Sequence, residues 1–255
     1  MNLSNLIAKG ELVDVYEDNG KAVKVFKAEM PKNKQKAFNE AMVHATVEAT
    51  GLPIPKVHGV CEVPEIEGAC AIVMDMAQGK TLAQLIKENP AKSDEYLNMM
   101  VDLQIDIQSH QVYHIGKLKD KLTRQINRLD DMGEVCKYEL LARLAGMPKH
   151  TKVCHGDFNP SNVIITPDGT PYVLDWSHAT QGNGSADAAR TYLLFRLNKQ
   201  DDVAEKYMKL FCEKTDTARQ YVNEWLPIVA ASQSVKGKPE EREFLLSWVN
   251  VCDYQ

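Results

Sequence analysis

The first quarter of the chain carries the short, alternating apolar segments that are typical of β-strands. Val13 and Val15 alternate with polar residues, and a second apolar segment covers residues 22–26. An Asp-Asn-Gly sequence at residues 18–20 separates them, and Asn-Gly supplies the positive φ values that a tight turn requires. This pattern predicts an antiparallel hairpin.

A helix is predicted over residues 35–51, because apolar residues recur there at helical spacing and Gly51 is suited to ending it. The residues expected to face the core are Phe38, Met42, Ala45 and Ala49. Prolines at 53 and 55 then favour an irregular or edge segment, since proline cannot donate a hydrogen bond to a sheet. The apolar sequence AIVMDM at 71–76 predicts a buried strand.

Beyond residue 80 the apolar spacing becomes helical. Asn89-Pro90 stops one segment and Gly146 another, and a single β-hairpin, with its turn at residues 166–169, interrupts the pattern. The predicted helices lie near residues 82–88, 96–107, 118–129 and 140–146, with three or four more between Ala186 and Cys252.

Strands first and helices later predict an α+β fold with two lobes. We place an N-terminal lobe at residues 1–77 and a helical C-terminal lobe at residues 78–255, joined near residues 75–79. A length of 255 residues is sufficient for two lobes, each with its own core.

Composition narrows the class of protein further. The chain is 44% hydrophobic and 25% charged, and no apolar run approaches the roughly 20 residues that span a bilayer. A net charge of −5 argues against nucleic acid or an anionic membrane as a partner. Six cysteines without a C-x-x-C pair favour reduced thiols in the cytoplasm. We expect a cytoplasmic monomer.

The sequence HGDFNPSN at residues 155–162, followed by the hairpin and then Asp175, carries the candidate chemistry. Phosphoryl transfer to an alcohol needs a carboxylate that orients the hydroxyl and accepts its proton. It also needs oxygen ligands that hold Mg²⁺ against the phosphates of a nucleotide. Asp157, Asn162 and Asp175 offer these groups in the order that kinases use.

These motifs, with GLPIPKVHGV and IVMDMAQGKTL before them, resemble the aminoglycoside phosphotransferase and choline kinase superfamily, whose members are small-molecule relatives of protein kinases. The resemblance covers about residues 7–194. It implies a two-lobed protein-kinase-like fold and a Mg²⁺-dependent transfer of phosphate from ATP or GTP to a small hydroxylated acceptor.

The resemblance also implies roles for particular residues. Asp157 would be the catalytic base, and Asn162 and Asp175 would ligate Mg²⁺. Lys24 would contact the nucleotide phosphates, with Glu40 as its partner on a helix.

The segment Met74–Ala77 would be the hinge, where the main chain of Asp75 and Met76 holds the purine. Asp187 would be a structural aspartate behind the catalytic loop, which His155 braces.

Each of these residues also has a structural explanation. Asp157 suits a turn, Lys24 a solvated strand face, Glu40 an ordinary helix surface, and Asp187 the first turn of a helix. The segment expected to cover the phosphates holds only Gly10, whereas the family pattern is rich in glycine.

Two other classes of protein therefore stay open: a nucleotide-binding pseudokinase that acts as a sensor, and a protein kinase. Among small-molecule kinases, the acceptor stays open between an aminoglycoside, a macrolide, choline, ethanolamine, homoserine and a sugar.

Overall fold

The computed structural model describes residues 1–130, 132–235 and 239–249. The chain forms two compact units. Unit 1 contains Met1–Glu88 and Pro160–Ser177, and unit 2 contains Asn89–Asn159 and His178–Gln255. Unit 1 is therefore discontinuous in sequence, because a hairpin from the middle of the chain completes it.

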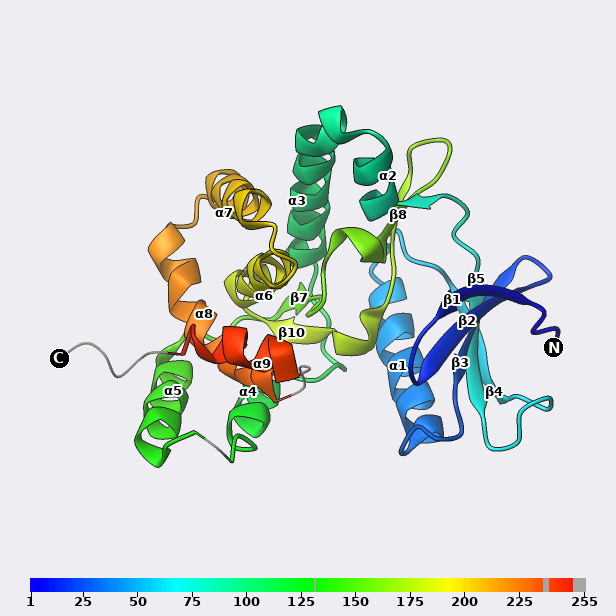
Figure 1. Ribbon diagram of the computed structural model, residues 1–255, viewed down its shortest axis with the longest axis horizontal. Helices are drawn as coiled ribbons and strands as arrows, with labels where there is room; N and C mark the ends of the chain where they lie inside the picture. Colours follow the sequence, from blue (N-terminus) through cyan, green and yellow to red (C-terminus); the bar gives the residue numbers. More distant parts are fainter. Residues whose placement is uncertain (131, 236–238, 250–255) are drawn as a thin grey trace. The chain divides into compact units, whose positions relative to one another are not determined.

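The main element of unit 1 is an antiparallel five-stranded sheet of order β1-β2-β3-β5-β4 (Figure 1). The predicted hairpin is confirmed: Asn19 and Gly20 form its two-residue turn with φ values of 50° and 76°. The predicted buried strand is β5, and the segment after the prolines ends in the edge strand β4. The strands are β1 (Asn5–Lys9), β2 (Val13–Asp18), β3 (Lys21–Phe26), β4 (Val57–Glu62) and β5 (Cys70–Asp75).

Helix α1 (Asn33–Glu48) lies against one face of this sheet (Figure 1). Its existence is confirmed, but the predicted core face is wrong, because Phe38, Met42, Ala45 and Ala49 are all exposed. The buried positions are Ala37, Glu40, Ala41, His44 and Val47. Small alanines let the helix approach the sheet closely, and this rotation turns Glu40 inward to meet a lysine on β3.

Unit 1 also holds the inserted hairpin and a short helix. β8 (Val163–Ile165) pairs with β9 (Pro171–Val173) and with β6 (Lys80–Thr81), and α2 (Leu82–Glu88) packs beside them. The main-chain N–H of Val173 donates to the carbonyl of Pro53 at 2.9 Å. This bond ties the hairpin to the segment that precedes the edge strand β4.

Unit 2 is mainly helical, as predicted. Its two-stranded sheet, β7 (Lys152–Cys154) with β10 (Thr180–Gly182), had no clear signal in the apolar pattern. Helix α6 packs against α7 and α8, and it is almost entirely buried. The helices are α3 (Ser93–Ser109), α4 (Leu118–Ile126), α5 (Glu134–Gly146), α6 (Gly184–Leu197), α7 (Asp201–Thr215), α8 (Arg219–Ser234) and α9 (Pro239–Leu246).

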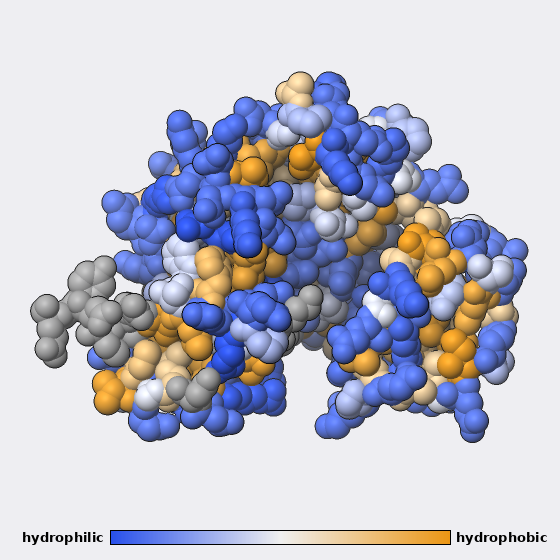
Figure 2. All heavy atoms as spheres, in the orientation of Figure 1, coloured by the Kyte–Doolittle hydropathy of each residue, from blue (hydrophilic) through white to orange (hydrophobic). Residues whose placement is uncertain are grey.

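The face of the molecule drawn in Figure 2 is mostly hydrophilic, with apolar side chains visible in places. Phe38 and Met42 are more than half exposed, and Tyr138 is 74% exposed. Across the described residues, no helix combines the length and apolarity needed to cross a membrane. The predicted C-terminal helices include four in the described part of the chain, while Cys252 lies outside the described residues.

Candidate active site

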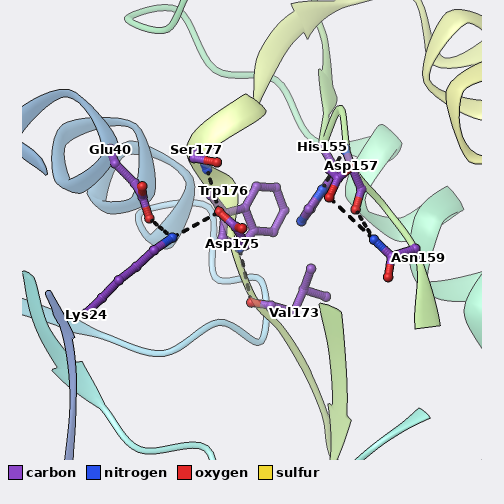
Figure 3. A network of polar contacts seen from close by, with 9 residues as sticks. All are labelled: Lys24, Glu40, His155, Asp157, Asn159, Val173, Asp175, Trp176 and Ser177. Carbon is purple, nitrogen blue, oxygen red and sulfur yellow. Dashed lines mark hydrogen bonds and ion pairs between the residues drawn. The ribbon is translucent and has the colours of Figure 1, made fainter. Parts of the chain in front are cut away.

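In unit 1, a single lysine on β3 meets two carboxylates that come from distant parts of the sequence (Figure 3). The ammonium of Lys24 lies 2.5 Å from Oε1 of Glu40 on α1 and 3.2 Å from Oδ1 of Asp175, which follows β9. Lys24 and Glu40 are largely buried, whereas the Asp175 side chain is 40% exposed. The structure therefore brings together three of the residues that the sequence singled out.

The charges in this cluster do not balance, and the pKa values reflect that. Burial alone would lower the pKa of the Lys24 ammonium, but the negative charges of Asp175 and Glu40 outweigh it and raise the pKa. For Glu40, burial raises the pKa of the carboxyl, Lys24 lowers it, and repulsion from Asp175 raises it; the net direction is upward. In their effect on pKa, two carboxylates therefore more than offset the burial of the Lys24 ammonium, whereas Lys24 does not offset the combined effect of burial and Asp175 on the Glu40 carboxyl.

Asn162 and Asp175 stand at the two sides of the open end of the β8–β9 hairpin. The main-chain N–H of Leu174 donates to the carbonyl of Asn162 at 2.8 Å, which fixes this spacing. Asp175 has a positive φ of 56°, and its Oδ1 accepts from the N–H of Ser177 at 3.4 Å. A left-handed conformation at a residue other than glycine costs of order 1–3 kcal/mol and is concentrated at functional sites.

The two donor residues at this hairpin suit a Mg²⁺ ion that is also bound by nucleotide phosphates, and they are too few for a metal held by protein ligands alone. Asn162 and Asp175 offer an amide oxygen and a carboxylate, and Mg²⁺ in nucleotide sites is bound by one or two such groups together with phosphates and water. Among the described residues there is no group of three or more His, Cys, Asp or Glu side chains that could hold a metal. A metal at Asn162 and Asp175 would therefore need the phosphates of a nucleotide.

In unit 2, Asp157 lies on the loop that follows β7 (Figure 3). Gly156 has a φ of 80°, and a Cβ there would lie 2.6 Å from the carbonyl oxygen of His178, so only glycine fits. The N–H of Asp157 donates to Nδ1 of the fully buried His155 at 3.2 Å, and the amide of Asn159 donates to the carbonyl of Asp157 at 2.9 Å. The loop backbone is thus held from both sides of Asp157.

Helix α6 holds the same loop through a buried aspartate. Asn183 caps the helix by accepting from the N–H of Ser185 at 2.9 Å, and Asp187 lies in the first turn. Oδ1 of Asp187 accepts from the N–H of Gly156 at 2.7 Å, and Oδ2 accepts from Nε2 of Gln104 on α3 at 3.1 Å. Asp187 is therefore both a first-turn acid and a direct partner of the loop.

Two further residues of α6 contact the loop, and the sequence reasoning missed both. Nη2 of Arg190 lies 3.2 Å from Oδ1 of Asp157, and the hydroxyl of Thr191 donates to the carbonyl of Phe158 at 3.0 Å. Burial lowers the pKa of the Arg190 guanidinium, although Asp157 acts in the opposite direction. The signal that could have found them is their spacing of three and four residues from Asp187, which puts all three on one helix face.

Asp75 and Met76, which the resemblance assigned to a hinge, line a pocket of about 570 Å³ in unit 1, together with residues 54–56 and the turn of the β8–β9 hairpin. The Asp75 carboxylate accepts from Lys21 at 2.7 Å and lies 2.7 Å from Nε2 of His58; these contacts lower its pKa to about 2. Lys21 pairs with Asp75 in the sheet, on the face opposite Lys24. The Asp75 side chain therefore belongs to a cluster separate from the lysine site.

In the turn between β1 and β2, a carboxylate of the protein itself accepts a hydrogen bond from the backbone. The N–H of Gly10 donates to Oδ1 of Asp14 at 3.1 Å, and the ammonium of Lys27 lies 3.1 Å from the same oxygen. Lys27 also donates to the carbonyl of Gly10 at 2.8 Å. The only glycine amide of this turn is therefore engaged by a carboxylate of the same strand pair.

Solved structures with the same architecture identify the fold class. A thermostable mutant of aminoglycoside phosphotransferase APH(4)-Ia has a TM-score of 0.70 at 17% identity, over 96% of this chain and 92% of that one. A complex of that enzyme with AMP-PNP and hygromycin B has a TM-score of 0.68 at 17% identity, over 96% and 90%. Choline kinase LicA from Streptococcus pneumoniae has a TM-score of 0.60 at 15% identity, over 97% and 93%. The predicted kinase-like α+β fold is confirmed.

The match to a family model is more specific than the fold. Residues 6–222 match the phosphotransferase enzyme family, so the chain belongs to that family. A comparison with curated proteins finds no significant match. The predicted resemblance to small-molecule phosphotransferases is thereby confirmed at the level of the family.

Proposed function

We propose that this protein is a Mg²⁺-dependent kinase that transfers the γ-phosphate of ATP or GTP to an alcohol group of a small acceptor. The observation that carries the proposal is the Lys24–Glu40–Asp175 cluster, because it unites three charged residues separated by up to 151 positions in a member of the phosphotransferase family. Lys24 offers a cation for the phosphates of a nucleotide, and the partly exposed Asp175 offers an oxygen ligand for Mg²⁺.

The residues divide the work as follows. Lys24 binds the nucleotide phosphates, and Glu40 holds the ammonium in place. Asn162 and Asp175 would hold Mg²⁺, which when bound neutralises charge on the phosphate oxygens. Asp157 orients the acceptor hydroxyl and takes its proton at a carboxylate oxygen. The main chain of Asp75 and Met76 holds the purine edge.

Because the transition state of phosphoryl transfer is loose and highly charged, position and electrostatics supply most of the acceleration. The structure of the relative with AMP-PNP and hygromycin B supports a purine nucleotide donor and a hydroxylated small molecule as acceptor. An antibiotic is one candidate acceptor class, and choline, ethanolamine, homoserine and simple sugars are the metabolic candidates.

The test measures nucleotide consumption by the purified protein with Mg²⁺, ATP or GTP, and a panel of these acceptors. Asp157→Ala removes the proton acceptor, so we expect turnover to fall by roughly 10²–10⁴ while nucleotide binding is retained. Asp175→Ala removes a metal ligand, so we expect it to lose Mg²⁺-dependent nucleotide binding itself. Calorimetry with and without Mg²⁺ separates the two variants.

Acceptor-dependent release of the nucleoside diphosphate (ADP or GDP) by the wild type, absent from Asp157→Ala, would support the reaction and name the acceptor. Tight Mg²⁺-dependent nucleotide binding by Asp175→Ala would contradict the metal assignment. Full turnover by Asp157→Ala would contradict the role of that carboxylate.

A second candidate is a protein that binds a nucleotide without consuming it. The β1–β2 turn favours this alternative, because its single glycine amide is engaged by Asp14. Such a protein would show Mg²⁺-dependent nucleotide binding but no release of ADP or GDP, either with any small acceptor or with generic protein substrates.

A further inference from the structure

One face of α6 contacts three consecutive residues of the loop that bears Asp157. Asp187 accepts from the N–H of Gly156, and Thr191 donates to the carbonyl of Phe158. Between these two backbone contacts, Arg190 is the residue of this face that reaches the Asp157 carboxylate itself. The helix thus fixes the main chain on both sides of Asp157 and the side chain in the middle.

The guanidinium of Arg190 is placed by this contact at a cost to its own hydrogen bonding. Its side chain is only 14% exposed, and its Nε is buried without a hydrogen-bond acceptor among the described residues. A buried donor without a partner is unfavourable, and proteins retain such groups where another contact outweighs the loss. Here the contact that orients the group is the 3.2 Å ion pair with Oδ1 of Asp157.

We propose that Arg190 is a positioning residue for phosphoryl transfer: it holds Oδ1 of Asp157, which fixes the carboxylate plane and directs Oδ2 toward the acceptor hydroxyl. The inference rests on the proposed function, in which Asp157 orients that hydroxyl.

The two oxygens of the Asp157 carboxylate have different neighbours. Nδ2 of Asn159 lies 3.5 Å from Oδ2, whereas Nη2 of Arg190 lies 3.2 Å from Oδ1. The other carboxylates whose charge acts on Arg190 are Glu241 on α9 and Asp187, and Asp187 is engaged by Gly156 and Gln104. The ion pair joins Nη2 of Arg190 to Oδ1 of Asp157, so it positions that oxygen.

The kinetic test compares Arg190→Met with the wild type, using the acceptor that the panel identifies or hydrolysis of the nucleotide, in which water replaces the alcohol. We expect kcat to fall about 10²-fold with the KM for nucleotide unchanged, because a misplaced catalytic group costs about that much. Arg190→Lys keeps the positive charge but changes the length and shape of the side chain, so its kcat should lie between the two.

A double variant separates positioning from a purely structural role. If Arg190 acts through Asp157, then Arg190→Met in an Asp157→Ala background should reduce the residual rate by less than about twofold, because residues that act as a unit are not additive. A full further loss of about 10²-fold would overturn the inference.

The matched control is Arg196→Met, which removes another arginine of α6. Arg196 pairs with Asp201 at 2.8 Å and lies over the ring of Trp248, with 5.2 Å to the ring centroid. Its kcat should stay within about twofold of the wild type. Thermal unfolding of each variant identifies any that has lost its fold.

A spectroscopic readout makes the result independent of turnover. In ¹⁵N-edited spectra of arginine side chains, Asp157→Asn should shift the Nε–H resonance of Arg190 and leave that of Arg196 in place. If the wild-type protein consumes no nucleotide, the proposed function is contradicted. The spectrum would still decide whether Arg190 holds Asp157. An unmoved Arg190 resonance overturns the inference in either case.

Discussion

Individual charges in unit 1 are arranged so that one cation serves two anions. Lys24 contacts Glu40 and Asp175, and Glu40 is the more deeply buried of the two carboxylates. Removing one partner of a buried pair leaves an uncompensated charge, which typically costs about 3–5 kcal/mol. Asp175 is more exposed, so water screens its share of the interaction. The charged form of Glu40 therefore depends more on Lys24 than the charged form of Asp175 does.

We predict that Lys24→Met lowers the free energy of unfolding by about 3 kcal/mol at pH 8 and by less at pH 5. Without its cation, the Glu40 carboxyl has a pKa raised further above its ordinary 4.5. The folded state then keeps a proton that the unfolded state releases, so stability falls as pH rises above about 4.5.

Urea unfolding at the two pH values checks this prediction. The control is Lys24→Met combined with Glu40→Gln, which removes the titrating group and should abolish the additional pH dependence. A Lys24→Met variant whose stability changes with pH no more than that of the wild type would contradict the account.

At the scale of elements, the loop that bears Asp157 is positioned by close backbone contact as well as by hydrogen bonds. Gly156 has a positive φ, and a Cβ at this position would collide with the carbonyl oxygen of His178. Gly169, in the turn of the β8–β9 hairpin, has a similar φ of 87°, and no atom lies within 4 Å of the position that a Cβ would take there. Substitutions at the two glycines can therefore distinguish the cost of backbone strain from the cost of a steric collision.

We predict that Gly156→Ala destabilises the protein by more than Gly169→Ala, because only the first adds a 2.6 Å collision with a backbone oxygen to the cost of the left-handed conformation. The left-handed conformation alone costs an alanine of order 1–3 kcal/mol at either position. Gly156→Ala should also reduce turnover, since Asp157 is the next residue. Denaturant unfolding of both variants provides the measurement, and equal losses of stability would show that the loop moves aside.

The amphipathic helix α1 shows how an element can be predicted while its orientation is not. Phe38 and Met42 are the largest apolar residues of the helix, and a rule based on hydrophobicity directs them to the core. The structure instead buries Ala37 and Ala41, which pack on Phe26 and Ile72 of the sheet. A close helix–sheet contact and the Lys24–Glu40 ion pair outweigh the burial of two larger side chains.

At the scale of the whole molecule, the chain crosses between compact units more than once. Residues 160–177 follow unit 2 in sequence but belong to unit 1. The N–H of Val173 donates to Pro53 in unit 1, while the N–H of Val153, only 20 positions earlier, donates to His110 in unit 2. Amides that are close in sequence are therefore protected from hydrogen exchange by the cores of different units.

We predict that Val23→Ala, which removes buried volume from the sheet of unit 1, speeds hydrogen exchange at the amide of Val173 more than at that of Val153. A loss of about 2 kcal/mol in unit 1 corresponds to roughly a 30-fold faster exchange at amides that open with it. Native-state exchange measured by NMR tests this. Leu193→Ala, in the core of unit 2, is the reciprocal control. Equal acceleration of both amides by Val23→Ala would indicate a single cooperative unit.

The sequence by itself determined the features that depend on near neighbours. The Asn19-Gly20 turn follows from local φ preferences, and the helices of unit 2 follow from apolar spacing. The sequence also places Asp157, Asn162 and Asp175 in the order that kinases use, which made them candidates. Only the tertiary structure decided which face of α1 is buried and which residues hold Asp157. The spacing of Arg190 and Thr191 from Asp187 places them on one helix face, but it does not identify their partner, because that partner is a loop more than 30 positions away. Such contacts are selected by the free energy of the whole fold, which hydrophobic periodicity does not encode.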